Sequence, residues 1–169
     1  MSKTIIGVMG AGDLATVEDL ELANRLGSAI AKNNWVLLTG GRNSGVMDAA
    51  SRGAKASNGL VIGVLPSNST VGISDAVDIA IVTDMGNARN NINVLSSNVV
   101  IACGMGLGTA SEITLALKNH KPVILLNQSE LIRQFFASFG SPQLFYAQTV
   151  SDAIALTKTI LMNCSNSIC

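Results

Sequence analysis

The chain has 169 residues, of which 48% are hydrophobic and 13% charged, and eleven basic residues balance eleven acidic ones. This length suits one domain with a sizeable core, and the low charge favours further apolar surface buried between subunits. The balanced charge argues against a nucleic acid partner, and the lack of any apolar run near the roughly 20 residues of a membrane span argues against a membrane protein. We therefore expect a cytoplasmic protein.

Apolar runs and amphipathic patterns alternate along the chain, which predicts strands alternating with helices. In chain order we expect a strand at Thr4–Met9, a helix at about Thr16–Lys32, a strand at Trp35–Leu38, a helix from Val46 to about Asn58, strands at Leu60–Leu65 and Ala76–Val82, a helix ending at about Ser97, a strand at Val99–Cys103, a helix capped by Thr109, a strand at Pro122–Leu126, a helix at Glu130–Phe139, an edge strand at Phe145–Gln148 and a helix at Ser151–Met162. The alternation predicts an α/β fold: a single-domain, Rossmann-like, doubly wound parallel sheet with helices on both faces. This domain spans 1–162, and we expect a disordered tail at 163–169.

Two of the predicted helices begin with capping patterns. Thr16 and Asp19 resemble a capping box, and so do Thr109 and Glu112. The first helix carries its apolar stripe at Val17, Leu22, Leu26 and Ile30. The second of these helices follows the bare glycine loop 104–108, so its free N–H groups predict an anion site.

Glycine-rich loops follow several of the predicted strands, namely Gly10–Asp13, Thr39–Gly45 and Gly104–Gly108. Because parallel strands bring their carboxyl ends to one edge of the sheet, these loops should meet there, together with the polar loop that carries Arg89. Arg42 and Arg89 can each offer a planar fork to a phosphate. The alternatives are that Arg42 pairs with a surface acid and that Glu112 only caps its helix. The polar segment Ser67–Ser74 is the best candidate for a mobile flap.

Several sharper motifs are excluded by what is missing. The loop at Gly10 lacks the acidic residue that binds the ribose in a nicotinamide dinucleotide site, since the next strand ends in Thr39. The glycine loops carry no lysine for the terminal phosphates of a nucleoside triphosphate. Ser44 misses the spacing of a serine hydrolase. Cys103 is expected to be a buried strand residue and His120 a solvated helix-terminal one, and we expect no metal site.

The motifs Thr39–Met47, Arg89-Asn90 and Gly106–Glu112 resemble those of the lysine-decarboxylase-like or "Lonely guy" superfamily of Rossmann-like proteins. Within it, the compact length and the Gly-Gly-Arg-x-x-Gly-Val-Met pattern of residues 40–47 are most similar to the molybdenum cofactor carrier proteins. The resemblance covers roughly Thr4 to Leu161.

This resemblance implies a non-catalytic protein that binds, protects and carries or stores the molybdenum cofactor, a phosphorylated molybdopterin whose dithiolene holds the metal. It also implies a homo-oligomer, a dimer or tetramer, and molybdoenzymes as recipients of the cofactor. The residues expected to contact the cofactor lie in the glycine loops and the Arg89 loop: Gly10, Gly12, Thr39, Gly40, Gly41, Arg42, Asn43, Ser44, Gly45, Asn87, Arg89, Asn90, Gly104, Met105, Gly106, Leu107, Gly108, Thr109 and Glu112.

The resemblance leaves an enzyme as the alternative. The cytokinin-activating members of the superfamily are phosphoribohydrolases that cleave the N-glycosidic bond of a nucleoside 5'-monophosphate with an arginine and a glutamate, which by motif fall on Arg89 and Glu112. This chain departs from their Pro-Gly-Gly-x-Gly-Thr motif at Met105 and has Asn90 where they have lysine, which favours binding over hydrolysis. A nucleotide-sensing module is a third hypothesis.

Overall fold

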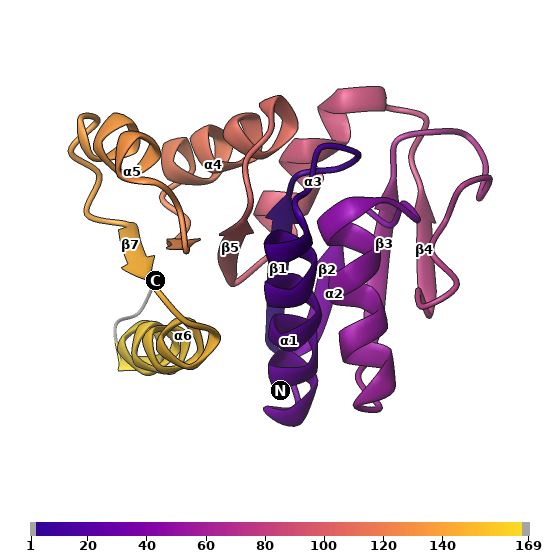
Figure 1. Ribbon diagram of the computed structural model, residues 1–169, viewed down its shortest axis with the longest axis horizontal. Helices are drawn as coiled ribbons and strands as arrows, with labels where there is room; N and C mark the ends of the chain where they lie inside the picture. The colour runs from indigo at the N-terminus through magenta and orange to yellow at the C-terminus, as the bar shows by residue number, and fades with distance from the viewer. Residues whose placement is uncertain (1–2, 167–169) are drawn as a thin grey trace.

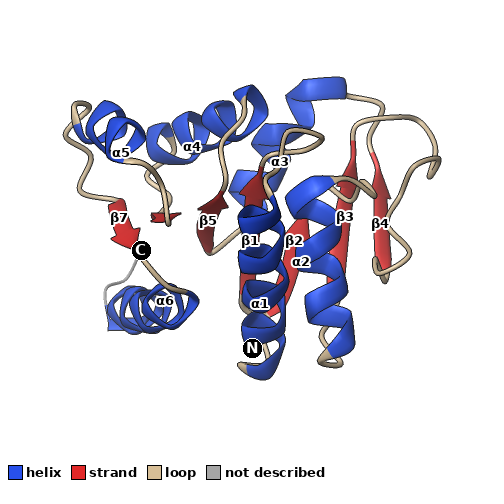
Figure 2. Ribbon diagram, in the orientation of Figure 1, coloured by secondary structure: helices blue, strands red, loops and turns tan. Residues whose placement is uncertain are grey.

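The computed structural model describes residues 3–166, in which strands and helices alternate as predicted (Figure 2). The elements are β1 (Ile5–Gly10), α1 (Val17–Lys32), β2 (Val36–Thr39), α2 (Gly45–Ala56), β3 (Val61–Leu65), β4 (Ile79–Val82), a 3-10 turn at Gly86–Ala88, α3 (Arg89–Ser96), β5 (Val99–Cys103), α4 (Leu107–Lys118), β6 (Val123–Leu126), α5 (Glu130–Ala137), β7 (Leu144–Ala147) and α6 (Val150–Asn166). The predicted edge strand near Phe145 is confirmed as β7.

The strands form one seven-stranded sheet in the order β4-β3-β2-β1-β5-β6-β7. Every neighbouring pair is parallel. The chain builds the sheet outward from β1 in one direction through β4, then returns to the other side of β1 with β5. The predicted fold class, a doubly wound Rossmann-like sheet, is therefore confirmed, and the strand order reverses between β1 and β5. In such sheets a ligand crevice is expected at this reversal.

Each face of the sheet has its own hydrophobic core. One core joins β1 to α1, α2 and α6, with Leu26 and Val46 fully buried. The other joins β5 to α3, α4 and α5, with Ile113 and Phe136 buried. In Figure 1, α1 and α2 lie side by side in front of the strands. The two helices approach closely because a Cβ at Gly27 would overlap the backbone of Ala50. Because helices cover both faces of the sheet, β5 is buried along its whole length.

Several boundaries differ from the prediction for local reasons. The capping box of Thr16 and Asp19 at the start of α1 is confirmed, but Val17 is 73% exposed and does not belong to the buried stripe. β4 begins at Ile79 rather than Ala76, because the hydroxyl of Ser74 accepts the N–H of Ala76 and holds a turn there.

The closing helix α6 continues past the predicted end at Met162. Residues 163–166, which belong to the tail for which we expected disorder, are helical, and 167–169 lie outside the described residues. In the part of the chain that the structure describes, the helices are too short or too polar to cross a membrane.

Candidate functional site

A cleft of about 390 Å³ lies at the reversal in strand order, where the loops after β1, β2 and β5 meet the start of α3. The loop after β1 reaches toward α3 at the upper end of the strand (Figure 1). The cleft is lined by Val8, Met9, Gly10, Ala11, Gly12, Asp13, Leu14, Gly40, Arg42, Met47, Asn87, Arg89, Asn90, Gly106, Leu107, Gly108, Thr109 and Glu112. A wider groove of about 600 Å³ between α1 and α2 lies away from these loops, and an exposed ion pair of Asp48 with Arg52 lines it. We therefore take the first cleft as the candidate site.

The first turn of α4 forms one wall of this cleft. Gly106 is the N-cap, with extended backbone angles (φ −156°, ψ 172°) and no side-chain hydrogen bond to the helix. The predicted capping box of Thr109 and Glu112 is therefore wrong: the helix begins directly after Gly106, so Thr109 lies inside its first turn. The first N–H groups of a helix have no partner within it and carry a partial positive charge. This wall is suited to an anion.

Arg89, the first residue of α3, also lines the cleft. Its side chain is buried, and its Nε and Nη1 atoms have no hydrogen-bond partner among the described residues. A Cβ at Gly40 would collide with this guanidinium, so Gly40 makes room for the arginine. Burial lowers the pKa of Arg89, which the charge of Glu112 opposes and the charge of Arg42 reinforces. A buried cation with free donors is a strong attractant for an oxyanion.

Glu112 completes the cleft from the second turn of α4. It is only 7% exposed, and its Oε1 accepts a hydrogen bond of 2.8 Å from the amide nitrogen of Asn93. Burial raises the pKa of Glu112, and the hydrogen bond from Asn93 and the charge of Arg89 oppose this. Within residues 3–166, no oxygen of Glu112 lies within 4.0 Å of a basic nitrogen, so Glu112 and Arg89 share the cleft without forming an ion pair.

The structure brings most of the predicted site residues together in the cleft, and places the rest outside its lining. Lining the cleft are Gly10, Gly12, Gly40, Arg42, Asn87, Arg89, Asn90, Gly106, Leu107, Gly108, Thr109 and Glu112. Outside the lining are Thr39, Gly41, Asn43, Ser44, Gly45, Gly104 and Met105. Six lining residues were not predicted: Val8, Met9, Ala11, Asp13, Leu14 and Met47. Each lies in or beside a glycine motif, and this proximity in the chain is the signal that could have found them.

The residues outside the lining have structural partners. The hydroxyl of Thr39 accepts the N–H of Gly41, and the hydroxyl of Ser44 donates to Asp13. The N–H of Val46 donates to the carbonyl of Ala11, so the loop after β1 closes the N-terminus of α2. Met105, which we expected to contact the cofactor, packs against the core that includes α3, α4 and α5 and does not line the cleft.

The segment Ser67–Ser74, predicted as a flap, is attached to the loop after β2. The N–H of Asn43 donates to the carbonyl of Gly72 and the N–H of Ser74 donates to that of Gly41, each at 2.9 Å. The Ser74 hydroxyl also donates to Asp48 at 2.6 Å. The segment lies outside the cleft lining, and its mobility stays a prediction.

The described residues contain no group of three or more His, Cys, Asp and Glu side chains that could hold a metal ion. Cys103 is a buried strand residue, as predicted, and burial raises the pKa of its thiol to about 12. Its sulfur donates a weak hydrogen bond to the carbonyl of Asp19. His120 is exposed at the end of α4, as predicted. The ionisable side chains that line the cleft are those of Arg42, Arg89, Asp13 and Glu112.

Comparison with known proteins places the chain among relatives of two kinds. The model of the SLOG cluster4 family matches residues 3–155. The solved molybdenum cofactor binding protein from the phototrophic bacterium Rippkaea orientalis is 61% identical, with a TM-score of 0.93 over 95% of this chain and 99% of that one. The molybdenum cofactor carrier protein from Chlamydomonas reinhardtii is 52% identical, with a TM-score of 0.91 over the same shares. A cytokinin riboside 5'-monophosphate phosphoribohydrolase from Rhodococcoides fascians is 32% identical over 67% of this chain and 62% of the enzyme.

Proposed function

The chain belongs to the SLOG cluster4 family, and we propose that within this family it binds and carries or stores the molybdenum cofactor without catalysing a reaction. The proposal is supported by two solved proteins, 61% and 52% identical, that are described as binding or carrying this cofactor. The phosphoribohydrolase relative is more distant, at 32% identity.

The observation that carries the proposal is the buried guanidinium of Arg89, whose Nε and Nη1 have no partner among the described residues, in the cleft that the first turn of α4 also lines. A buried polar atom without a partner costs about 1–3 kcal/mol, which a bound oxyanion would recover. The cofactor offers oxyanions of two kinds, a terminal phosphate and the oxo groups on its metal. The cleft volume of about 390 Å³ lies within the range of small-molecule sites.

The glycines divide the cleft into parts with different roles. A Cβ at Gly10 would overlap the carbonyl of Cys103, so this glycine is required by the contact of β1 with β5. In contrast, a Cβ at Gly108 meets no atom within 4 Å, and those at Gly12 and Gly106 meet none closer than 3.6 Å. Since protein packing does not require the last three to be glycine, they leave space for a ligand. We place the phosphate there, against the first turn of α4.

The remaining lining suits the rest of the cofactor. Val8, Met9 and Met47 give an apolar floor on which a flat pterin ring can lie. Asn87 and Asn90 carry amide groups that can pair with the polar edges of the ring. Arg42 adds a second positive charge at the exposed end of the cleft. The described residues contain no metal-binding cluster, so the protein would hold the metal through the organic part of the cofactor.

The test is to mix the purified protein anaerobically with cofactor released from a donor enzyme, desalt it, and assay the protein fraction for molybdenum and oxidised-pterin fluorescence. We expect both in stoichiometric amounts. Arg89→Ala and Arg42→Ala should each reduce retention, because a hydrogen bond to a charged group contributes about 1.5–3 kcal/mol, equivalent to about 10- to 150-fold in affinity.

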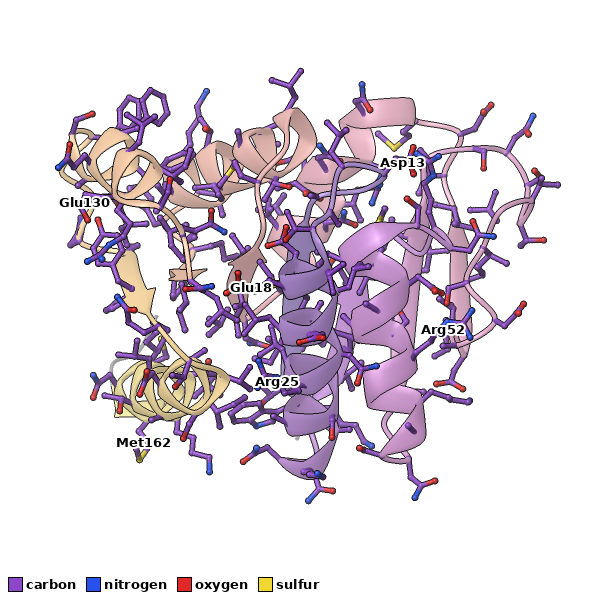
Figure 3. All side chains as sticks on the ribbon, in the orientation of Figure 1. Asp13, Glu18, Arg25, Arg52, Glu130 and Met162 are labelled. Atoms are coloured by element: carbon purple, nitrogen blue, oxygen red, sulfur yellow. The ribbon has the colours of Figure 1, made fainter. Side chains whose placement is uncertain are left out.

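The matched control is Arg25→Ala, which replaces an exposed arginine of α1 that lies well below Asp13 in Figure 3; Asp13 lines the cleft and Arg25 does not. This variant should retain as much cofactor as the wild type. If neither molybdenum nor pterin stays with the wild-type protein, the carrier function is wrong. If both cleft variants retain the cofactor fully, the site assignment is wrong.

The second candidate function is hydrolysis of a nucleoside 5'-monophosphate. It is favoured by one observation: Arg89 and Glu112 lie in the same cleft, as the resemblance to the phosphoribohydrolases requires. An enzyme of this kind would release a free base from a purine riboside monophosphate, and Glu112→Ala would abolish the release. A carrier would release no base from a broad panel of nucleotides.

We also propose that the protein is a cytoplasmic homo-oligomer, a dimer or tetramer, that delivers the cofactor to molybdoenzymes. The edge strand β4 supports an oligomer, because its apolar side chains Ile79, Ile81 and Val82 are each more than 40% exposed. Light scattering on the purified protein tests the oligomeric state: a monomer at micromolar concentration would contradict it.

A further inference from the structure

Buried polar side chains form a cluster at the cleft: Arg89, Thr109 and Glu112 line it, and Asn93 donates a hydrogen bond to Glu112. Arg89, Asn93, Thr109 and Glu112 are each at least nine-tenths buried. Unpartnered atoms of this cluster are Nε and Nη1 of Arg89, Oδ1 of Asn93 and Oγ1 of Thr109, counted among the described residues. The cluster therefore has two free donor nitrogens, a free hydroxyl and a free amide oxygen, together with a single carboxyl group. The charge of the cluster and the number of donors that it offers depend on whether that carboxyl group is ionised.

The other charged side chains that line the cleft come from three elements, and among them Arg89 acts on the charge of Glu112. Arg89 approaches from α3, Arg42 from the loop after β2, and Asp13 from the loop after β1. Asp13 is an exposed carboxylate that accepts a hydrogen bond from the hydroxyl of Ser44. The strands β1 and β5 contribute no ionisable group to the cleft lining, since β1 supplies Val8, Met9 and Gly10 and β5 supplies none. Glu112 is thus the buried acid of the cleft.

An oxyanion bound between Arg89 and the first turn of α4 would lie in the same cleft as Glu112. If Glu112 is ionised, the two negative charges repel in a site shielded from water. If Glu112 is protonated, the repulsion disappears and the acid gains an O–H donor. The hydrogen bond from Asn93 engages Oε1, which leaves Oε2 for this proton.

We propose that Glu112 binds the oxyanion of the ligand as a neutral carboxylic acid, so that binding takes up one proton from the buffer and ionisation of Glu112 weakens it. This inference rests on the oxyanion site of the proposed function and adds how that site is regulated. Burial already favours the neutral form, because it raises the pKa of Glu112 in the free protein. A bound oxyanion raises the pKa further. Glu112 is therefore the residue that makes loading of the cleft favourable at lower pH and release favourable at higher pH.

The test uses sulfate as the probe, because it stays a dianion between about pH 5 and 9 and cannot itself account for a proton. Sulfate binding to the full-length protein is measured by calorimetry against chloride at constant ionic strength, across this pH range. The measurement is repeated in buffers of different ionisation enthalpy, which gives the number of protons taken up. We expect about one proton per sulfate at the pH where free Glu112 is ionised, and a Kd that rises up to about tenfold per pH unit.

Two variants separate Glu112 from the other titrating groups. Glu112→Gln mimics the neutral acid and can still accept the hydrogen bond from Asn93, so it should bind sulfate with a Kd independent of pH and without proton uptake. His120→Asn is the matched control, since His120 is exposed at the other end of α4 and its left-handed backbone (φ 56°) suits asparagine. This variant should keep the wild-type pH dependence.

The outcomes distinguish the inference from the function on which it rests. If wild-type protein binds sulfate with no proton uptake, or Glu112→Gln keeps the wild-type pH slope, the inference is overturned while the oxyanion site stands. If folded wild-type protein binds no sulfate at any pH, the oxyanion site is refuted and the inference with it. If Glu112→Gln does not fold, proton uptake by the wild-type protein on binding sulfate tests the inference by itself.

Discussion

Replacing Gly108 with alanine should stabilise the protein and weaken its binding of ligand at the same time. Gly108 is the second residue of α4, and a Cβ built on it meets no heavy atom within 4 Å. Alanine is preferred over glycine in a helix by about 0.5–1 kcal/mol. In a domain of this size this gain raises Tm by about 1–4 °C. The same methyl group would project into the space beside the first N–H groups of α4, where we place the phosphate.

The loss of binding can be estimated from one displaced hydrogen bond to a charged group, about 1.5–3 kcal/mol, which weakens Kd by roughly 10- to 150-fold. Thermal unfolding without ligand and calorimetric titration with sulfate measure the two effects on the same sample. Gly10→Ala is the control, because its Cβ would overlap the carbonyl of Cys103 and should lower Tm. Unchanged sulfate affinity in Gly108→Ala would refute the location of the oxyanion site. A lowered Tm would show that the space beside Gly108 is too small for a methyl group.

Two further predictions follow from the buried ionisable groups. Burial raises the pKa of Glu112 above the ordinary value of 4.5, so the folded protein holds a proton that the unfolded chain releases. The contribution of this proton to the free energy of unfolding is complete below the pKa of the unfolded chain, and it is lost as pH rises through the pKa of the folded protein. Glu112→Gln should therefore raise Tm at neutral pH and leave it unchanged near about pH 4, and an unchanged Tm at neutral pH would contradict the burial penalty. Cys103, with a pKa of about 12, should resist alkylation in the native protein while the exposed Cys164 reacts; peptide mass spectrometry after labelling checks this, and modified Cys103 without unfolding would contradict it.

The fold could be predicted because its signals are local. The run Val99–Cys103 is apolar throughout and ends in glycines, and the structure buries every residue of it in β5. Strands separated by helices require parallel pairing with right-handed crossovers, which is sufficient to bring the glycine loops to one edge. Arg89 and Glu112 could be found for the same reason: each follows closely after the carboxyl end of a strand.

The roles of individual glycines could not be predicted, because they depend on contacts between distant parts of the chain. Gly10 and Gly108 look alike in the sequence, yet the first is required by the neighbouring strand and the second borders open space. Gly40 was expected to contact the cofactor; it does line the cleft, and it also makes room for the guanidinium of Arg89. Such differences appear only when residues far apart in the sequence are placed together.

The start of α4 shows a local signal overruled by its surroundings. Thr109 and Glu112 satisfy the sequence pattern of a capping box, but the helix begins earlier, with Gly106 as its N-cap. Glu112 then lies in the second turn and accepts its hydrogen bond from Asn93 of α3. A capping pattern cannot report how the chain leaves the preceding strand, which decides where the helix begins.

The state of Glu112 also links the two candidate functions. A hydrolase that cleaves an N-glycosidic bond needs an ionised carboxylate to stabilise the positive charge that develops on the sugar. Here burial favours the neutral acid, and Arg89 is too distant to hold the carboxylate in an ion pair. The burial that weakens Glu112 as a catalytic carboxylate is the property that suits it to bind an oxyanion with a proton. This property agrees with the proposed function, in which the pair retains a ligand without cleaving it.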